Sequence, residues 1–329
     1  MKFSVISAGL LAAFASAAPT PTSEEVVNRA AIVKRASITD ACNIGYASTH
    51  GGTKGGAGGA TTTVSTYAQF TKAATAGKSV VVVAGPITQN AKQVKVASDT
   101  TIIGANSKAV LTGFGLLVKD QKNVIIRNIA IKEVLAANAD ALGIQKSTNV
   151  WVDHVDLSSN LNHDKDYYDG LLDVTHAADW VTISNSFIHD HWKASLVGHS
   201  DSNGAEDKGF LHVTYANNFW QNVNSRGPSI RFGTAHIYNS YHNNVSDGIN
   251  TREGAQVLVE SNAWANSKKA LYSTNAGYAV ANDNDFGSSS NEALKGTLTG
   301  SKLGYSYSLV GSSKVKAAVV GSAGNTLSF

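Results

Sequence analysis

Short apolar runs recur along the chain from Ser79 onward, and polar residues separate them. The runs are rich in β-branched residues and are bounded by Gly, Asn, Asp or Ser; they cover residues 80–83, 101–103, 124–126, 150–152, 181–183, 212–215, 236–238 and 257–259. Runs of this length between turn residues are typical of β-strands. No helical pattern joins one run to the next, which excludes a doubly wound α/β fold, because its parallel strands need crossover helices. The pattern therefore predicts an all-β fold.

A tag of the form Asn-x-aromatic follows several of these runs. It begins at Asn185, Asn217, Asn239, Asn262 and Asn284, and the last four are 22, 23 and 22 residues apart. A constant period of this size indicates a solenoid, and a period that contains strands but no helix indicates one coil of a parallel β-helix. A β-sandwich with coincident turns is the alternative, but it does not explain the period.

Coils of such a solenoid stack about 4.8 Å apart, so equivalent residues of successive coils are neighbours. We expect the tag asparagines to hydrogen-bond in a ladder and the tag aromatics to stack inside the coils. Two intervals exceed the period, because positions 150 and 181 are 31 residues apart and positions 185 and 217 are 32 apart. Insertions in a solenoid emerge as loops, often on the binding face. These intervals contain Asp169, Asp173 and Lys193, so we expect the site there.

Three further stretches complete the predicted domain. Thr66-Tyr-Ala-Gln69 fits a capping box and predicts a short N-terminal helix that Gly77 closes, the only helix expected. The Gly-rich stretch 51–59 lacks the spacing of a phosphate-binding loop, so we interpret it as a flexible surface segment. Residues 287–329 are rich in Ser and Gly, and we expect them to pack as strands or loops along the solenoid.

The N-terminus has the pattern of a processed leader. Lys2 precedes an apolar run over residues 3–14 and small residues follow it, which predicts a secretory signal peptide over 1–17. The polar segment 18–35 ends in Lys34-Arg35 and is interpreted as a propeptide, with a disordered tail as the alternative. We therefore expect a secreted protein whose mature chain is one β-helix catalytic domain over 36–329. No other run is long enough to span a membrane.

Charge and cysteine content narrow the function classes. The 329 residues carry a formal net charge of +3, which becomes +1 without residues 1–35, since these hold four basic and two acidic residues. Nucleic-acid binding usually needs a basic stripe, and none is present, so no nucleic acid and no membrane is expected as a partner. The single Cys42 has no internal disulfide partner, so a large core or a metal must hold the secreted fold.

Carboxylates and cations follow one another between residues 137 and 231. Asp140, Asp169 and Asp173 fall on neighbouring coils, and an all-oxygen cluster suits Ca²⁺ rather than a transition metal. Solvated loop aspartates are the alternative. His189 and His191 lie two apart, which suggests zinc, but no third ligand has a convincing spacing.

Lys193, Arg226 and Arg231 follow the acids, and cations in this number suit a substrate that carries many carboxylates. Surface arginines with apolar stems are the alternative. The chain has no Gly-x-Ser-x-Gly motif for a serine hydrolase. A glycosidase with two catalytic carboxylates is a stronger rival, but it does not need this set of cations.

Several segments resemble pectate lyases of polysaccharide lyase family 1, the secreted type of fungi and bacteria. The matching segments are Asp140-Ala-Leu, Asn149-Val-Trp-Val-Asp-His154, Asp164-Lys-Asp-Tyr-Tyr-Asp169-Gly-Leu-Leu-Asp173, Phe187-Ile-His-Asp-His-Trp-Lys193 and Val223-Asn-Ser-Arg226-Gly-Pro-Ser-Ile-Arg231. The resemblance covers about residues 36–286. It implies a single-stranded, right-handed parallel β-helix, in agreement with the period, with loop insertions on the binding face.

The same resemblance implies roles for the charged residues. It assigns Ca²⁺ binding to Asp140, Asp169 and Asp173. It assigns the binding of substrate carboxylates to Lys193 and Arg231, and it makes Arg226 the catalytic base. One position departs from some family members, since Asn138 stands where they carry a further aspartate. We therefore expect fewer charged ligands and a weaker metal site without substrate.

The implied activity is Ca²⁺-dependent β-elimination in α-1,4-linked polygalacturonate, which leaves a 4,5-unsaturated end, by a monomeric enzyme. Arginine is a strong base with a pKa above 12, so this assignment predicts activity that rises toward alkaline pH. A pectin lyase acting on methyl-esterified pectin without Ca²⁺ is the first alternative. A non-catalytic β-helix that binds acidic polysaccharide is the second.

Overall fold

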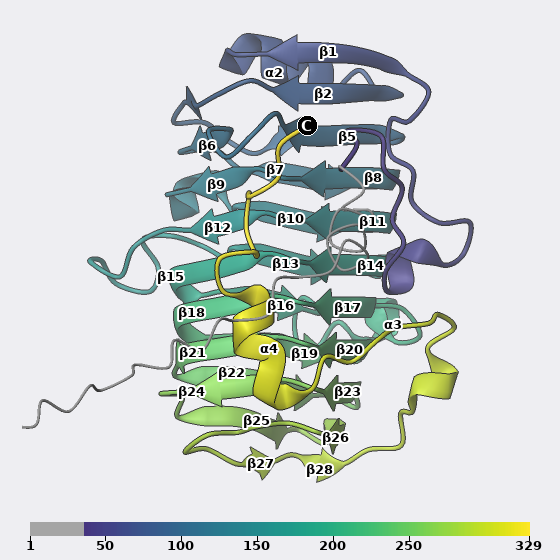
Figure 1. Cartoon of the computed structure of the whole chain (residues 1–329), viewed down its shortest axis with the longest axis vertical. Helices are drawn as coiled ribbons and strands as arrows, with labels where there is room; N and C mark the ends of the chain where they lie inside the picture. The colour runs from purple at the N-terminus through teal and green to yellow at the C-terminus, as the bar shows by residue number, and fades with distance from the viewer. Residues whose placement is uncertain (1–35) are drawn as a thin grey trace, which may run out of the picture. The chain divides into compact units, whose positions relative to one another are not determined.

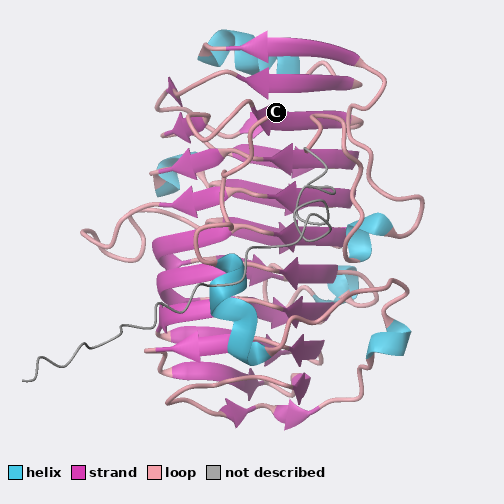
Figure 2. Ribbon diagram, viewed as in Figure 1, coloured by secondary structure: helices cyan, strands magenta, loops and turns pink. Residues whose placement is uncertain are grey.

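Parallel strands wind through residues 36–329, the part of the chain that the computed structural model describes (Figures 1 and 2). Along most of the chain, each strand pairs with the strand that comes three later, so three strands make one coil. All pairings between the described strands are parallel. The chain is therefore an all-β parallel β-helix, as the sequence period predicts. The predicted signal peptide and propeptide fall on residues 1–35, which lie outside the described residues.

The strands form three sheets, named A, B and C in the order in which a coil visits them. Sheet A contains 11 strands: β1 (Ala60–Val64), β2 (Ser79–Val83), β5 (Thr100–Gly104), β8 (Lys122–Arg127), β11 (Thr148–Asp153), β14 (Asp179–Ser184), β17 (His212–Ala216), β20 (Thr234–Tyr238), β23 (Gln256–Glu260), β26 (Tyr278–Asn282) and β28 (Leu294–Lys295). Sheet B contains 8 strands: β3 (Ile87–Thr88), β6 (Val110–Thr112), β9 (Ala130–Lys132), β12 (Asp156–Ser158), β15 (Phe187–Lys193), β18 (Phe219–Ser225), β21 (Tyr241–Val245) and β24 (Ala263–Ala265). Sheet C contains 9 strands: β4 (Val94–Lys95), β7 (Leu116–Lys119), β10 (Leu142–Gln145), β13 (Leu172–Thr175), β16 (Ser195–Val197), β19 (Ser229–Arg231), β22 (Asp247–Arg252), β25 (Lys269–Thr274) and β27 (Asn291–Glu292).

Few helices accompany the strands. They are α2 (Tyr67–Ala74), α3 (Gly204–Asp207) and α4 (Ser312–Val319), with the 3₁₀ turns η1 (Tyr46–Ser48), η2 (Ala136–Asn138) and η3 (Gly300–Lys302). Helix α2 is the predicted one: the Thr66 hydroxyl accepts a hydrogen bond from the Gln69 N–H at 3.3 Å, and the Gln69 side chain accepts one from the Ser65 N–H at 3.1 Å. It buries Phe70 against the coils beside β1 and β2 (Figure 1).

The interior is filled by β-branched residues that stack in register from coil to coil. Val124, Val150, Val181 and Val213 pair along sheet A, and each is 0% exposed. Full burial of such a side chain contributes about 1.5–3 kcal/mol. This interior explains the sequence pattern, because strands whose inner positions face a closed coil need an apolar residue at each of them.

The Asn-x-aromatic tag belongs to two adjacent ladders. Asn217 donates to Asn185 and Asn239 donates to Asn217, each at 3.1 Å. Tyr238 pairs with Glu260 in the next coil, so the residue equivalent to Asn239 is Ser261, 22 positions later. A serine therefore takes the ladder position in that coil. Asn262 lies one residue later and donates to Asn284 at 3.0 Å in a second ladder. The expected hydrogen bonding between tag asparagines is therefore confirmed within each ladder, and the 23-residue interval marks the change from the first ladder to the second.

The tag aromatics divide in the same way. Phe187, Phe219 and Tyr241 stack with centroids 4.7 and 5.5 Å apart, and they form a cluster with residues of α4. Trp264 instead belongs to the main core and stacks on His242 at 4.6 Å. Phe286 stacks on Trp264 at 5.2 Å and packs against the same core. The expected stack inside the coils is thus correct for Trp264 and Phe286, whereas the other three rings lie on the outer face of sheet B.

The C-terminal segment lies along the coils and contains a helix that the sequence pattern did not predict. Val315 and Val319 of α4 are buried against the outer aromatic stack. Beyond the helix, Leu327 and Asn128 exchange two hydrogen bonds of 2.9 Å each. The segment therefore covers sheet B over several coils (Figure 1).

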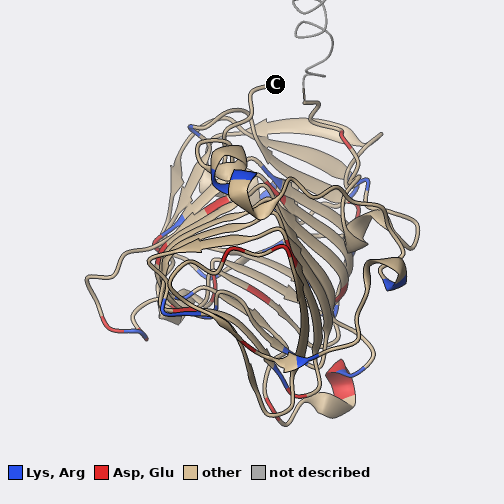
Figure 3. Cartoon of the chain, turned by 60° about the horizontal axis from the view of Figure 1, so that its bottom comes forward, with Lys and Arg blue, Asp and Glu red and all other residues tan. Residues whose placement is uncertain are grey.

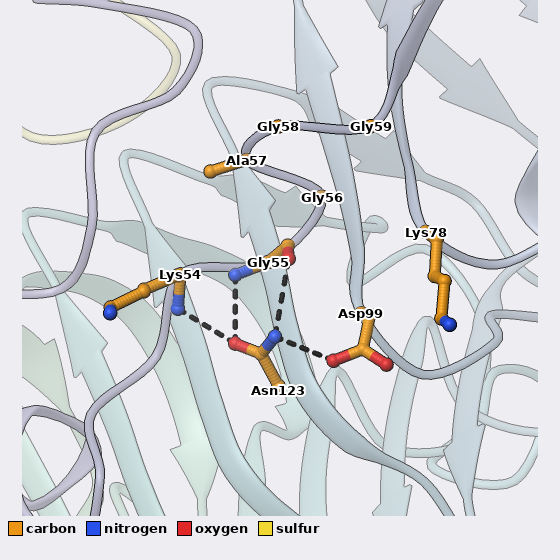
Figure 4. A pocket seen from close by; sticks show the side chains of 9 residues that line it. All are labelled: Lys54, Gly55, Gly56, Ala57, Gly58, Gly59, Lys78, Asp99 and Asn123. Carbon is orange, nitrogen blue, oxygen red and sulfur yellow. Dashed lines mark hydrogen bonds between the residues drawn. The ribbon is translucent and has the colours of Figure 1, made fainter.

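The Gly-rich stretch is held against sheet A rather than free of it. The Asn123 side chain accepts hydrogen bonds from the N–H groups of Lys54 and Gly55 at 2.7 and 2.9 Å (Figure 4). A Cβ on Gly56 would lie 1.9 Å from the Ser79 carbonyl oxygen, so only glycine permits this approach. The stretch borders an open pocket of about 470 Å³ near Lys78.

Cys42 is a free cysteine that is buried in a small cluster with Ala47, Ile125 and Trp151. Burial raises the pKa of its thiol to about 12, which makes the thiol unreactive at neutral pH. None of the described helices is long and apolar enough to cross a membrane.

Candidate active site

The candidate residues come from four successive coils and gather at sheet C and the turns that enter it. Asp140 precedes β10, Asp169 precedes β13, and Asp173 lies within β13. The cations come from the next two coils: Lys193 ends β15, Arg226 lies between β18 and β19, and Arg231 ends β19. In the view of Figure 3, charged residues are scattered over the coils, and neither sign forms a continuous stripe.

A glycine allows two of the carboxylates to converge. A Cβ on Gly170 would lie 2.7 Å from one oxygen of Asp173 and 2.9 Å from one of Asp140, so both oxygens contact the same point. Asp140 accepts a hydrogen bond from the Gly170 N–H at 3.0 Å, and Asp173 accepts one from the Leu196 N–H at 3.1 Å. Backbone donors on two coils therefore fix the orientation of both side chains.

Burial makes these carboxylates unusually basic. Burial, followed by the negative charge of Asp169, raises the pKa of Asp140 to about 6, against the opposing effects of the Gly170 N–H and Arg226. Burial and the charge of Asp140 raise the pKa of Asp173 well above its usual range. A cation between the two side chains would favour their ionised forms.

Asp169 is shared between this acidic pair and the cations. Lys193 Nζ lies 3.4 Å from an oxygen of Asp169 and 3.2 Å from one of Asp166. Within residues 36–329, no group of three or more His, Cys, Asp or Glu side chains is arranged to hold a metal ion. The donors themselves fit a hard cation, since Asp140, Asp169 and Asp173 offer only oxygen and two of them share one contact point.

Asn138 is turned toward the preceding coil. It is 8% exposed, and its amide donates to Asn90 at 2.6 Å and to the Gly113 carbonyl at 3.2 Å. The weaker metal site expected from an asparagine at this position stays a prediction. The contact with Asn90 is one that the sequence pattern could not indicate, because it joins residues of separate coils.

Arg226 lies beside the acids without an ion-pair partner in the described part of the chain. Its backbone has a left-handed φ of 61°, and its carbonyl accepts a hydrogen bond from the Ser195 N–H at 2.9 Å. The charge of Arg226 opposes the rise in pKa at both Asp140 and Asp173. The guanidinium is therefore close to the acidic pair. The Gly227-Pro228 peptide bond, which follows Arg226, is cis.

Arg231 is held by groups that the sequence pattern missed. Its Nε bonds to the carboxylate of Asp201, and its Nη1 donates to the Gly198 carbonyl at 3.2 Å. Arg252, its register partner on β22, binds the second oxygen of Asp201 at 2.8 Å. The only signal for Asp201 in the sequence is its position in the longer interval between the tags at 185 and 217.

His191 and Trp192 anchor the loop that carries Asp169. His191 Nε2 donates to the Asp169 carbonyl at 2.5 Å, and its Nδ1 lies 2.5 Å from the Ser159 hydroxyl. Trp192 Nε1 donates to the His163 carbonyl at 2.8 Å. Burial lowers the pKa of His191 to about 4, so the ring is neutral above that pH.

The two histidines considered for zinc do not share a site. His189 contacts Asp190 at 2.6 Å and Asp156 at 3.2 Å, whereas His191 binds the loop. Their different partners explain why the histidine spacing alone was misleading. Both rings serve hydrogen bonds between neighbouring chain segments.

The chain is similar in sequence to known proteins over nearly its whole length. The family model described as pectate lyase matches residues 4–328. A probable pectate lyase A from Aspergillus fumigatus (strain CBS 144.89 / FGSC A1163 / CEA10) is 67% identical over 100% of both chains. Pectate lyase A from Aspergillus niger is 62% identical over 100% of this chain and 99% of that protein.

Solved structures resemble the fold. A pectate lyase from Bacillus sp. N165, solved in complex with trigalacturonate, has a TM-score of 0.76 and 28% identity, and the match covers 86% of this chain and 98% of that one. Pectate lyase II from Xanthomonas campestris pv. campestris has a TM-score of 0.70 and 28% identity over the same shares of the two chains. The chain therefore belongs to the pectate lyase family of enzymes.

Proposed function

We propose that this enzyme cleaves α-1,4-linked polygalacturonate by Ca²⁺-dependent β-elimination and leaves a 4,5-unsaturated end. The observation that carries the proposal is the meeting of a buried carboxylate pair, Asp140 and Asp173, with Arg226 at one end of sheet C. A neighbour in complex with trigalacturonate supports a galacturonate chain as the ligand. Relatives named pectate lyase A support the reaction type.

Asp140, Asp169 and Asp173 are the residues that would hold Ca²⁺. When bound, the ion would supply positive charge that stabilises negative charge on the substrate carboxylate and beside it. The acidic pair is already oriented by the N–H groups of Gly170 and Leu196. Little rearrangement is therefore needed at these two side chains.

Lys193 and Arg231 would bind galacturonate carboxylates on either side of the cleaved bond. Arginine can bind a carboxylate through two parallel N–H groups, whereas lysine acts as a point charge. Lys193 faces Asp169, and Arg231 lies on the following coil. This arrangement would hold the substrate at two places and leave the reacting sugar next to Arg226.

Arg226 would act as the base. In its neutral guanidine form it takes the proton from C5 and becomes a guanidinium, the electrons of that C–H bond form the C4–C5 double bond, and the bond from C4 to the glycosidic oxygen breaks. The leaving oxygen then gains a proton from solvent. Among residues 36–329, Lys193 and Arg231 pair with carboxylates, and Arg226 has no ion-pair partner that would hold its side chain away from the substrate.

The direct test measures ultraviolet absorbance of unsaturated uronate on two substrates, each with and without a calcium chelator. We expect absorbance on polygalacturonate that chelator abolishes and added Ca²⁺ restores. Activity on esterified pectin that survives the chelator would instead establish a pectin lyase. Absence of absorbance on both substrates would leave only a polysaccharide-binding role.

We further propose that the enzyme is secreted as a monomer after removal of residues 1–35. The leader pattern of residues 1–17 and the Lys34-Arg35 end support this processing. The lack of an internal disulfide partner for Cys42 is compatible with secretion, because the interior provides a large apolar core. N-terminal sequencing of secreted protein should begin at Ala36.

A further inference from the structure

One carboxylate joins two arginines of sheet C. The oxygens of Asp201 bind Nε of Arg231 and Nη2 of Arg252, the latter at 2.8 Å. Arg231 and Arg252 are register partners on β19 and β22. Asp201 therefore neutralises one of two adjacent positive charges on the face where Arg231 is assigned to the substrate.

Asp201 comes from the insertion that joins β16 to β17, and this loop is anchored at both ends. At its start, a Cβ on Gly198 would lie 2.7 Å from the Cβ of Arg231, and the φ of Gly198 is +86°. At its end, the fully buried Asp207 accepts a hydrogen bond from the Ala177 N–H at 2.8 Å. The loop thus presents Asp201 to the arginines at a fixed place.

Further contacts secure α3, which closes this loop. The Asn203 side chain donates to Asp207 at 2.9 Å, and Glu206 lies 3.2 Å from Lys146 and 2.9 Å from His176. These contacts reach two other coils, so the loop does not need the bond to Arg231 for its own attachment. The contact of Asp201 with the arginines is consequently not needed to attach the loop, and its main effect is on the charge beside Arg231 and Arg252.

The net charge of Asp201, Arg231 and Arg252 affects whether an ionised or a methyl-esterified sugar binds beside them. Asp201 is 46% exposed, whereas Arg231 and Arg252 are 13% and 22% exposed. A substrate carboxylate approaching Arg231 would meet the carboxylate of Asp201 at short range, and like charges repel. A methyl-esterified carboxyl carries no charge and would meet no such repulsion.

We propose that Asp201 is a specificity-determining residue that weakens the preference of the subsite at Arg231 and Arg252 for an ionised galacturonosyl residue and so raises its acceptance of a methyl-esterified one. This inference rests on the proposed function. Asp201 lowers the net charge of the two guanidinium groups from +2 to +1 and thereby weakens the preference for an ionised sugar at this subsite.

The test compares polygalacturonate with a partially methyl-esterified pectin, both saturated with Ca²⁺. The measured quantity is the ratio of kcat/KM on the first substrate to kcat/KM on the second. We expect Asp201→Asn to raise this ratio about fivefold through KM, with kcat nearly unchanged, as suits the loss of one partly exposed charge. Asp201→Ser, which also removes the charge but leaves no amide beside the guanidinium groups, should give the same result.

Controls separate this inference from the function on which it rests. Asp201→Glu keeps the charge and should keep the wild-type ratio, as should Asp120→Asn on the exposed end of β7. High salt should shrink the effect of Asp201→Asn, because exposed charges are screened. An active wild type with an unchanged ratio in both neutral variants would overturn the inference alone. A wild type that forms no unsaturated product would overturn the proposed function.

Discussion

At the scale of single residues, the acidic pair combines burial with mutual repulsion. Burial and Asp169 raise the pKa of Asp140 to about 6, whereas an unfolded aspartate titrates near 3.8. The folded protein therefore holds this proton more tightly than the unfolded chain does. Stability without Ca²⁺ must fall as pH rises through this window, because the folded carboxyl group loses its proton at an energetic cost.

Asp140→Asn tests this linkage. In a calcium chelator, we expect the free energy of unfolding of the wild type to decline between about pH 4 and pH 7, by on the order of 2 kcal/mol relative to the variant. Urea unfolding at several pH values measures this difference. Added Ca²⁺ should stabilise the wild type at pH 7 far more than the variant.

Asp120→Asn is the matched control, since Asp120 is exposed at the end of β7. It should follow the wild type at every pH. If Asp140→Asn declined in parallel with the wild type, the tight proton binding assigned to this carboxyl group would be wrong.

Single residues also show where sequence reasoning ends. Residue types and spacing pointed to acids and cations between residues 137 and 231, because such clusters suit a metal and an anionic substrate. Their partners Asp201 and His191 were not assigned. Each acts on a residue 22 or 30 positions away, through contacts that only the stacking of coils creates.

At the scale of elements, the tag predicts the length of the repeat correctly, but tags of successive coils do not always occupy equivalent positions. Coils repeat every 22 residues between β20 and β23, as the pairing of Tyr238 with Glu260 shows. Asparagine forms hydrogen bonds between coils at either of two adjacent corner positions. The Asn-x-aromatic tag therefore begins one residue later in the coil of Asn262 than in the coil of Asn239. Strand residues alternate between faces, and this shift moved Trp264 inward while Tyr241 stayed outside.

Helix α4 escaped prediction because its apolar face is small. Only Val315 and Val319 are buried in its eight residues, too few for a clear helical pattern. The helix is stabilised instead by the aromatic stack of Phe187, Phe219 and Tyr241 beneath it. Tertiary packing thus determines an element that its own sequence specifies weakly.

Val315→Asp should detach α4 from sheet B. A charge at this buried position lacks a partner, and we expect the free energy of unfolding to fall by about 2–4 kcal/mol. Activity per folded molecule should stay near the wild-type value, since α4 packs on sheet B and the candidate site lies at sheet C. Thermal unfolding and an assay well below the melting temperature measure the two effects.

Ala317→Asp is the control for this change, because it places the same charge on an exposed position of α4. It should leave stability nearly unchanged. A loss of turnover in Val315→Asp at a temperature where the protein is fully folded would mean that α4 influences the site.

At the scale of the whole described unit, the stacking of coils brings together residues that are far apart in the sequence. Acids from two coils and cations from the next two lie on one face, because parallel strands of sheet C hold them in register. The apolar runs and the 22-residue period were sufficient to predict this architecture. The loops were not predictable in detail, since their shape depends on contacts such as that of Asn123 with the Gly-rich stretch.

We propose that this face presents Arg226 to the substrate as the base that removes the C5 proton. Arg226→Lys keeps a cationic side chain but replaces the planar guanidine group with the amine of a shorter side chain. General-base catalysis contributes about 100- to 10,000-fold, so we expect kcat to fall at least 100-fold. Arg231→Lys, in contrast, should mainly raise KM.

The decisive measurement combines turnover with binding in the Arg226→Lys variant, at saturating Ca²⁺ and alkaline pH. Absorbance of unsaturated product gives kcat, and calorimetric titration with oligogalacturonate gives affinity. We expect affinity close to that of the wild type together with the loss of nearly all turnover. Turnover near the wild-type level would contradict this expectation.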